Sequence, residues 1–290
     1  MNSNLISRVD AVLEANYRAR GPRQAREVEL IRRVRCLRSE VGCDRPPVDV
    51  SRIARHLGVS DIRSLRILAD GQLRNEDGKL ILELSDKAPE GRRRFTIAHE
   101  IGHLLLADGG SFGCGTIRSR GFATNREADP VEERWCDFIA AEVLAPIDWA
   151  CDFVYGKPPG FETIQAMAKY FEISLSVATR RAVETGIWKI RQISWEQAGS
   201  DYRAVAAYPP YAPSTIAFLR LESPADSLVA RALRTGRLQS GRERVVMEGE
   251  SQPYDVDVWC ESRGRATMLL ILEPRKMPRV NAPVQAQLPF

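Results

Sequence analysis

The chain has 290 residues, of which 44% are hydrophobic and 28% are charged, a balance that excludes collagen-like, coiled-coil and disordered proteins. Its formal net charge of +4 does not by itself indicate nucleic-acid binding. Residues 268–272 form the longest apolar run and are too few to span a membrane, and the first residues show no secretory signal. We therefore expect a cytoplasmic protein without membrane contact. The six cysteines form no CxxC pair, so we expect them to be reduced.

The first part of the chain predicts two helices and then a hairpin. Residues 24–40 combine apolar positions at helical spacing with many arginines, which fits either a solvated helical face or a contact with an acidic or nucleic-acid surface. A short helix is expected over residues 49–57. Residues 66–84 are extended, with an Asp-Gly turn before the last strand. If that strand, 79–84, lies at a sheet edge, a peptide substrate can pair with it.

Two long helices and a helix-turn-helix pattern follow. Apolar spacing predicts helices over residues 89–107 and 131–144, and glycines make the segment 108–126 between them a loop. Residues 161–186 predict two further helices joined by a turn. The remaining chain predicts short extended segments with one helix near 224–235. The sequence thus predicts an α+β fold in three parts, residues 1–150, 151–190 and 191–290.

Two histidines four residues apart, His99 and His103, are the most informative feature, since the chain has only three histidines. They form an H-E-x-x-H pattern inside a predicted helix. The spacing places both imidazoles on one helix face, where their nitrogens can bind one Zn²⁺. Glu100, between them, can take a proton from a water that the metal activates. The pattern predicts a zinc-dependent hydrolase.

A hydrolytic zinc site needs a third protein ligand, and no histidine follows His103. The candidates are carboxylates at the start of the next predicted helix. We predict Glu133 as the ligand, with its neighbour Glu132 as the nearest alternative. Asp137 follows Glu133 by about one helical turn, so it can accept a hydrogen bond from the far nitrogen of a ligating histidine.

With these residues, the chain resembles the ImmA/IrrE family of zinc metallo-endopeptidases. Two motifs carry most of the resemblance: R-F-T-x-A-H-E-x-G-H-L-L-L beginning at Arg94, and E-x-x-C-[ND]-x-x-A-A-x-x-L-x-P beginning at Glu133. Residues 46–49 and 58–59 match as well. The sequence departs from the usual pattern at Asp137, where asparagine is frequent, and at Ala145, where methionine is usual.

The resemblance implies a zincin-like metallopeptidase domain within residues 1–150, built of helices and a small sheet. It implies Glu100 as the catalytic base and a Zn²⁺ cofactor, which Mn²⁺ can replace in vitro. The zinc ligands that it implies are His99, His103 and Glu133.

The resemblance also implies a regulatory role. Family members of this layout resemble proteases that cut a helix-turn-helix repressor of the XRE type, encoded nearby, and so release stress or antiviral defence genes. Residues 151–190 would then be a helix-turn-helix-like segment, and residues 191–290 a GAF-like sensory domain. Arginines in the latter fit either a solvated surface or a site for an anionic activator such as single-stranded DNA. The candidates are Arg231, Arg234 and Arg237.

Two other classes of function are open to the sequence. A DNA-binding transcriptional regulator would use the helix-turn-helix pattern at 163–181, with Arg180 and Arg181 in its second helix. The charges of residues 162–186 sum to zero, however, which favours helical packing or a docking surface for substrate. An inactive peptidase scaffold that only binds a partner is disfavoured, because Glu100 is intact.

A cysteine offers a means of control. Cys114 lies 11 residues after His103 in a glycine-rich loop. A thiolate is a strong zinc ligand, so Cys114 can serve as an inhibitory fourth ligand that excludes the catalytic water. The alternative is a loop cysteine without a role. Cys136, in contrast, is expected in the core of its helix.

Overall fold

The computed structural model of the protein describes residues 22–107, 129–209, 216, 219–247, 249–262 and 264–272. Contacts divide the chain into two compact units: Met1–Ala150 with Met167–Arg181, and Cys151–Ala166 with Ala182–Phe290. Helices and strands lie in largely separate stretches of the chain, which confirms the α+β class. The three-part division into residues 1–150, 151–190 and 191–290 stays a prediction.

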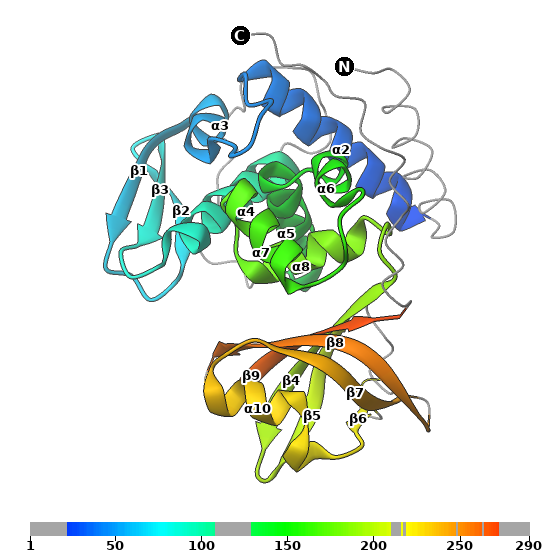
Figure 1. Ribbon diagram of the computed structural model, residues 1–290. Helices are drawn as coiled ribbons and strands as arrows, with labels where there is room; N and C mark the ends of the chain where they lie inside the picture. The colour runs from blue at the N-terminus through cyan, green and yellow to red at the C-terminus, as the bar shows by residue number, and fades with distance from the viewer. Residues whose placement is uncertain are drawn as a thin grey trace, which may run out of the picture. The chain divides into compact units, whose positions relative to one another are not determined.

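The helices of the first unit bring the predicted zinc motif against its predicted third ligand. Helix α4 (Glu90–Ala107) carries the H-E-x-x-H pattern and packs along α5 (Pro130–Leu144) (Figure 1). Asp129 caps the start of α5, because its side chain accepts a hydrogen bond from the Val131 N–H at 2.9 Å. Pro130 suits the first turn, since it has no N–H group that would lack an acceptor there. The helix ends at Leu144, and its C-cap residue, Ala145, precedes a proline. Both helices therefore lie close to their expected bounds.

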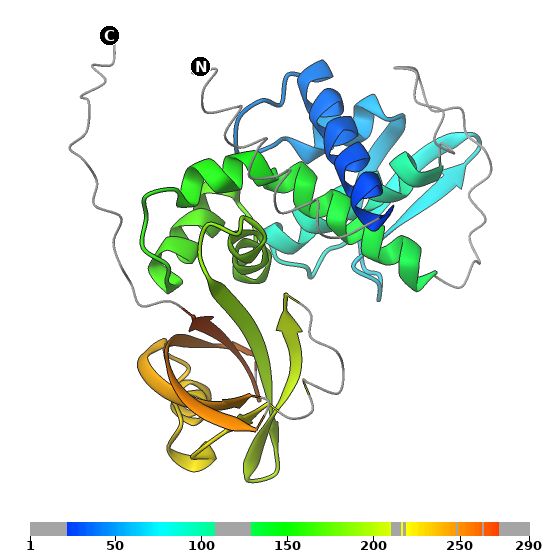
Figure 2. The same ribbon diagram turned by 90° about the vertical axis from the view of Figure 1, so that its right-hand side faces the viewer.

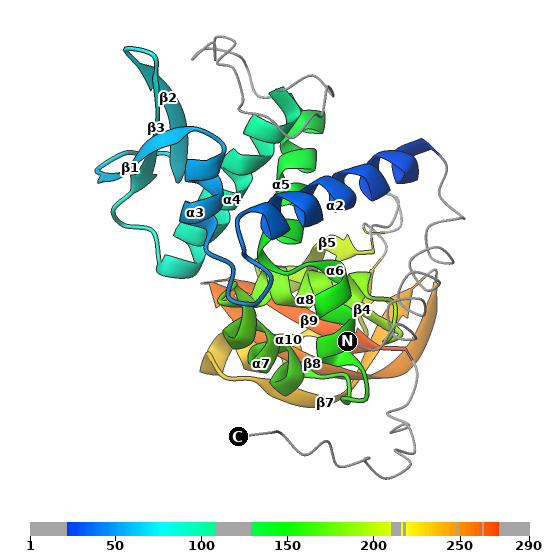
Figure 3. The same ribbon diagram turned by 90° about the horizontal axis from the view of Figure 1, so that it is seen from above.

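Two further helices pack against this pair, and three more follow α5 in the chain. Helix α2 (Pro22–Glu40) packs against α5 (Figure 3) through a buried apolar stripe that includes Val34. Helix α3 (Val50–His56) begins where Asp49 accepts the Arg52 N–H at 3.0 Å, as its sequence predicts. The three helices that follow α5 each contribute residues to both units. They are α6 (Ile147–Val154), α7 (Phe161–Phe171) and α8 (Leu175–Glu184).

A three-stranded sheet in the order β1–β3–β2 lies beside α4. Strand β1 (Val59–Leu65) pairs parallel to β3 (Lys79–Ser85), and β2 (Gly71–Glu76) pairs antiparallel to it. The hairpin turn uses Asp77 and Gly78 in the left-handed region, at φ 51° and 79°. The sequence does not predict β1, because an edge strand with mostly polar residues shows little hydrophobic alternation.

The expectation that residues 79–84 form a sheet edge is wrong. Strand β3 is the central strand, and its residues 81–85 are all buried. It is the most apolar of the three strands, so it takes the position where a neighbouring strand covers each side. The open edges of this sheet are β1 and β2.

The second unit is built on a six-stranded antiparallel sheet with the order β5–β4–β9–β8–β7–β6. Helix α10 (Leu228–Thr235), between Ser227 as N-cap and Gly236 as C-cap, lies against one face of this curved sheet (Figure 2). Its buried side chains join a core around Trp195 and Met268. The strands are β4 (Ile190–Ala198), β5 (Asp201–Tyr208), β6 (Arg220–Leu221), β7 (Gln239–Met247), β8 (Glu250–Ser262) and β9 (Arg265–Ile271).

A short 3-10 helix, Pro224–Asp226, precedes α10, so the helix expected near residues 224–235 is confirmed. No helix in the described part of the chain combines the length and the apolarity needed to cross a bilayer.

Candidate metal centre

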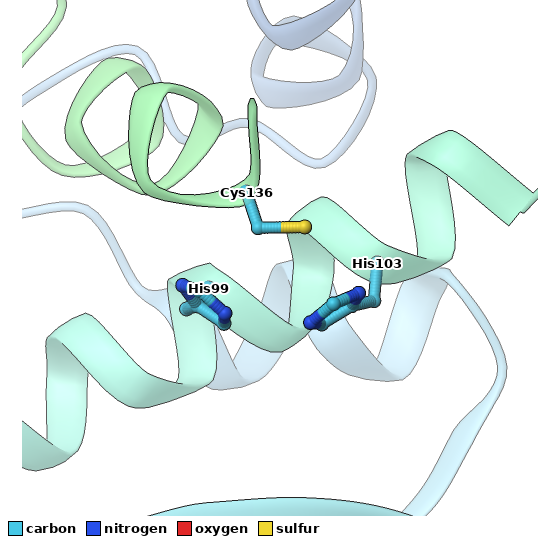
Figure 4. Close-up of side chains that lie close together, drawn as sticks. All are labelled: His99, His103 and Cys136. Atoms are coloured by element: carbon cyan, nitrogen blue, oxygen red, sulfur yellow. The ribbon is translucent and has the colours of Figure 1, made fainter. Parts of the chain in front are cut away.

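The two histidines project from one face of α4 toward α5 (Figure 4). The opposite stripe of α4 is buried and includes Ala98, Ile101 and Leu105. His99 and His103 are half-buried, and their ring centroids lie 5.1 Å apart. The i, i+4 spacing has therefore placed the imidazoles as the sequence predicts.

One carboxylate of α5 reaches both rings. Glu133 Oε2 lies 3.0 Å from His99 Nε2, and Glu133 Oε1 lies 3.4 Å from His103 Nε2. Two imidazole nitrogens and a carboxylate thus converge from adjacent helices. This is the donor set of a His-His-Glu catalytic zinc site.

The other nitrogen of each ring also contacts a carboxylate. Asp137 Oδ1 lies 3.0 Å from His99 Nδ1, and Glu132 Oε1 lies 3.1 Å from His103 Nδ1. Carboxylates in this place orient a metal-ligating histidine and fix its tautomer. The donor set and these outer contacts therefore fit a bound zinc ion. The contact of Asp137 with His99 Nδ1 is the one predicted from its position one helical turn after Glu133.

Glu132 has a role that sequence reasoning missed. The sequence weighs it only as a rival to Glu133 for the metal, whereas the structure places it on the ring nitrogen of His103 that faces away from Glu133. The signal was available, since each ligating histidine needs a partner for its second nitrogen and α5 opens with two consecutive glutamates.

Cys136 borders the same site. Its side chain is fully buried, as expected for a core position, and its Sγ lies within 4.8 Å of donor atoms of both histidines (Figure 4). His99, His103 and Cys136 therefore form a second possible ligand group. We favour Glu133 as the third ligand, because its two oxygens contact the Nε2 atoms of both rings directly.

The site shifts the titration of two of its residues. Burial raises the pKa of Glu100, although His103 and His99 oppose the shift. Burial alone would lower the pKa of His99, but the hydrogen bond and charge of Asp137 raise it overall, with help from Glu100 and Glu133. The H-E-x-x-H helix thus has a half-buried carboxyl group beside its two histidines.

The remaining predicted site residues fall elsewhere. Cys114 lies outside the described residues. The third histidine, His56, lies on α3 with its Nε2 3.4 Å from Glu40 Oε2. In the second unit, Arg231, Arg234 and Arg237 are exposed, and none of them forms an ion pair with the described residues. Two arginines near them in sequence, Arg242 and Arg244, do pair, with Asp255 at 3.5 Å and with Glu222 at 2.6 Å.

The helix-turn-helix pattern has a structural use in the first unit. Arg181, in α8, is only 2% exposed and pairs with the equally buried Glu142 of α5 at 3.0 Å. At the turn before α8, Glu172 accepts a hydrogen bond through its backbone oxygen from Arg94 Nε at 3.2 Å. Arg94 also donates from Nη2 to the Val48 carbonyl at 2.9 Å. The arginine that opens the zinc motif thus links three segments.

These features define a metallopeptidase type of site on an α+β domain. Residues 46–183 match the peptidase-family model described as the IrrE N-terminal-like domain. The match confirms that this part of the chain resembles the ImmA/IrrE proteins.

Among solved structures, a transcriptional regulator of Mycobacterium tuberculosis is similar at a TM-score of 0.50 and 14% sequence identity, over 91% of this chain and 81% of that one. At that identity the likeness shows the fold alone. The comparison with curated proteins gives no match.

Proposed function

We propose that this protein is a zinc-dependent endopeptidase that cleaves a helix-turn-helix transcriptional repressor and thereby derepresses stress or antiviral defence genes. The observation that carries the proposal is the Glu133 carboxylate, which lies across the Nε2 atoms of His99 and His103 while a separate carboxylate holds each Nδ1 atom. Such an arrangement suits three ligands to one metal with their orientation fixed from outside. The family of residues 46–183 supports the peptidase assignment.

The proposed roles follow from the chemistry of each group. His99, His103 and Glu133 would hold the zinc, or Mn²⁺ in vitro, and the bound ion would supply a Lewis acid that polarises the scissile carbonyl and acidifies water. Glu100 would accept the proton of the attacking water at its carboxylate and then deliver it to the leaving amine. The raised pKa of Glu100, caused by burial, suits a group that must do both near neutral pH.

The substrate peptide would pair with β2 rather than with the central β3. Gly71, the first residue of β2, lies directly against the Thr96 side chain of α4, one turn before His99. Because β2 is an edge strand, its free backbone groups can receive an extended peptide. A substrate bound there would pass close to the histidines.

The second part of the proposal concerns regulation. Residues 151–190 would serve as a helix-turn-helix-like docking segment, and residues 191–290 as a GAF-like sensory domain. The exposed side chains of Arg231, Arg234 and Arg237 support an anionic signal, for which single-stranded DNA is the candidate. The role of Cys114 as an inhibitory fourth ligand stays a prediction.

The alternative function, a DNA-binding regulator, has weaker support. Arg181, at the end of the candidate recognition helix, is buried and pairs with Glu142, so its side chain stabilises the fold and is not available to contact DNA. A gel-shift experiment with duplex promoter DNA tests this alternative, and salt-sensitive binding by the full chain would restore it.

Substitution of the proposed base tests the peptidase assignment. Glu100→Gln should abolish repressor cleavage while zinc remains bound, because it removes the base and no ligand. His103→Ala and Glu133→Ala should lose zinc as well. The control is Glu90→Gln, the same change at an exposed position in the first turn of α4. Cleavage by the Glu100→Gln variant at the wild-type rate would contradict the mechanism.

The substrate is identified by co-expression. A small helix-turn-helix repressor encoded beside this chain should yield discrete fragments with the wild-type protein and none with Glu100→Gln. Mass spectrometry of the fragments locates the bond that is cut.

A further inference from the structure

The glycine of the zinc motif lies where the backbones of α4 and α5 come close together. Gly102 is buried, lies between His99 and His103 in the sequence of α4, and faces the backbone of Cys136 on α5. A Cβ placed on Gly102 would lie 2.8 Å from the Cα of Cys136, 3.1 Å from its Cβ and 3.2 Å from its carbonyl oxygen. Real Cβ atoms do not approach other atoms to 2.8 Å, so a side chain here would require one helix backbone to move.

Helix stability does not explain a glycine at this position. Glycine weakens a helix interior relative to alanine, and α4 is otherwise rich in good helix formers. The other glycine of α4, Gly91, has ordinary surroundings, because a Cβ there would meet nothing nearer than 3.9 Å. The two glycines of one helix therefore differ in what an added methyl group would displace.

We propose that Gly102 is a positioning residue for the metal site, because it permits the backbone contact that brings the α5 carboxylates onto the α4 histidines. This inference rests on the proposed function. Cys136 lies three residues after Glu133 and one before Asp137, so any displacement of α5 at Cys136 is passed to both carboxylates.

The magnitude of the displacement supports a direct effect on the metal. Relief of the contact requires a shift of roughly half an ångström, since 3.4 Å is the lower limit of ordinary packing. Metal sites tolerate deviations of only about 0.2 Å in ligand distances. A shift of that size at Cys136 would move Glu133 and Asp137 relative to His99, which both contact at 3.0 Å.

The test uses Co²⁺ alone as the probe, and visible absorption measures its binding to the full chain. Gly102→Ala should bind Co²⁺ at least tenfold more weakly than the wild type and with a weaker tetrahedral band. Gly91→Ala should bind within twofold of the wild type. Ile139→Val, which loosens the buried side of α5 without adding a group, should do the same, so general destabilisation is controlled.

The outcomes separate this inference from the proposed function. Wild-type affinity in Gly102→Ala would overturn the inference alone, whereas a wild-type chain that binds no Co²⁺ would overturn both. If Gly102→Ala does not fold, nuclear Overhauser effects in the wild-type chain decide. A strong cross-peak between Hα protons of Gly102 and Cys136, together with a Gly91→Ala variant that does fold, supports the close contact. Absence of the cross-peak overturns the inference.

Discussion

Three carboxylates of α5 contact the two histidines of α4, and each has a different place on the rings. Glu133 contacts both Nε2 atoms, Asp137 contacts His99 Nδ1, and Glu132 contacts His103 Nδ1. A carboxylate at Nδ1 fixes which nitrogen keeps its proton and how the ring is turned. At the scale of single residues, the site therefore depends on the outer carboxylates as well as on the proposed ligands.

Removal of either outer carboxylate should weaken metal binding. Glu132→Ala and Asp137→Ala should each lower zinc affinity by about 10–100-fold, the range usual for such partners. Competition with a chelating dye measures the effect, and Glu90→Ala, an exposed acid at the start of α4, is the control. Unchanged affinity in both variants would mean that these contacts do not orient the rings.

At the scale of elements, a buried charge cluster joins four helices of the first unit. Glu142 of α5 pairs with Arg181 of α8 at 3.0 Å and accepts the Ile147 N–H of α6 at 3.3 Å. Arg38 of α2 is 3% exposed and stacks 4.3 Å over the ring of Trp149. Buried charges are costly unless they are paired, so the Glu142–Arg181 pair favours this docking of α5 against α8.

Burial raises the pKa of Glu142 to about 7, against the opposing charges of Arg181 and Arg38 and with a contribution from Asp148. The folded state then binds a proton more tightly than the unfolded chain, whose glutamate pKa is near 4.5. The stabilisation is complete below that value and is lost as the pH rises through about 7.

The free energy of unfolding should consequently fall between pH 5 and 7, by up to about 1.4 kcal/mol per pH unit. Glu142→Gln, which cannot ionise, should lack this component. Urea unfolding of the metal-free wild type and of the variant at several pH values measures this component. The histidines are present in both proteins, so their titration does not contribute to the difference. Parallel pH profiles for the two proteins would show that Glu142 does not titrate in this range.

At the scale of the whole molecule, the chain contains two compact units, and each has a sheet and a buried core of its own. The proposed metal site lies entirely in the first unit, and the three exposed arginines, Arg231, Arg234 and Arg237, lie in the second. The proposed signal would thus bind one unit and change the activity of the other, which requires that the two be coupled.

Charge reversal in the second unit tests that coupling. Arg231→Glu combined with Arg234→Glu should remove the stimulation of repressor cleavage by single-stranded oligonucleotides, because the anionic backbone would meet like charge. Arg203→Glu is the control, since Arg203 is an arginine of the same unit that already pairs with Glu196 at 3.6 Å. Stimulation that survives the double reversal would exclude this location for the signal.

The sequence by itself determined the features that depend on local spacing. The positions of His99 and His103 on one face follow from the helical period, and the start of α5 follows from Asp129 and Pro130. Such local patterns can be recognised without knowledge of distant segments of the chain. The family motifs are local for the same reason.

Only the tertiary structure decided how separate elements meet. Glu132 and Glu133 are adjacent in sequence and about 100° apart around α5, so the docking of α5 on α4 selects which one faces both Nε2 atoms. The central place of β3 and the inward turn of Arg181 toward Glu142 depend likewise on distant partners. Helical spacing fixes directions within one element, whereas contacts between elements depend on packing over the whole unit, which no short stretch of sequence contains.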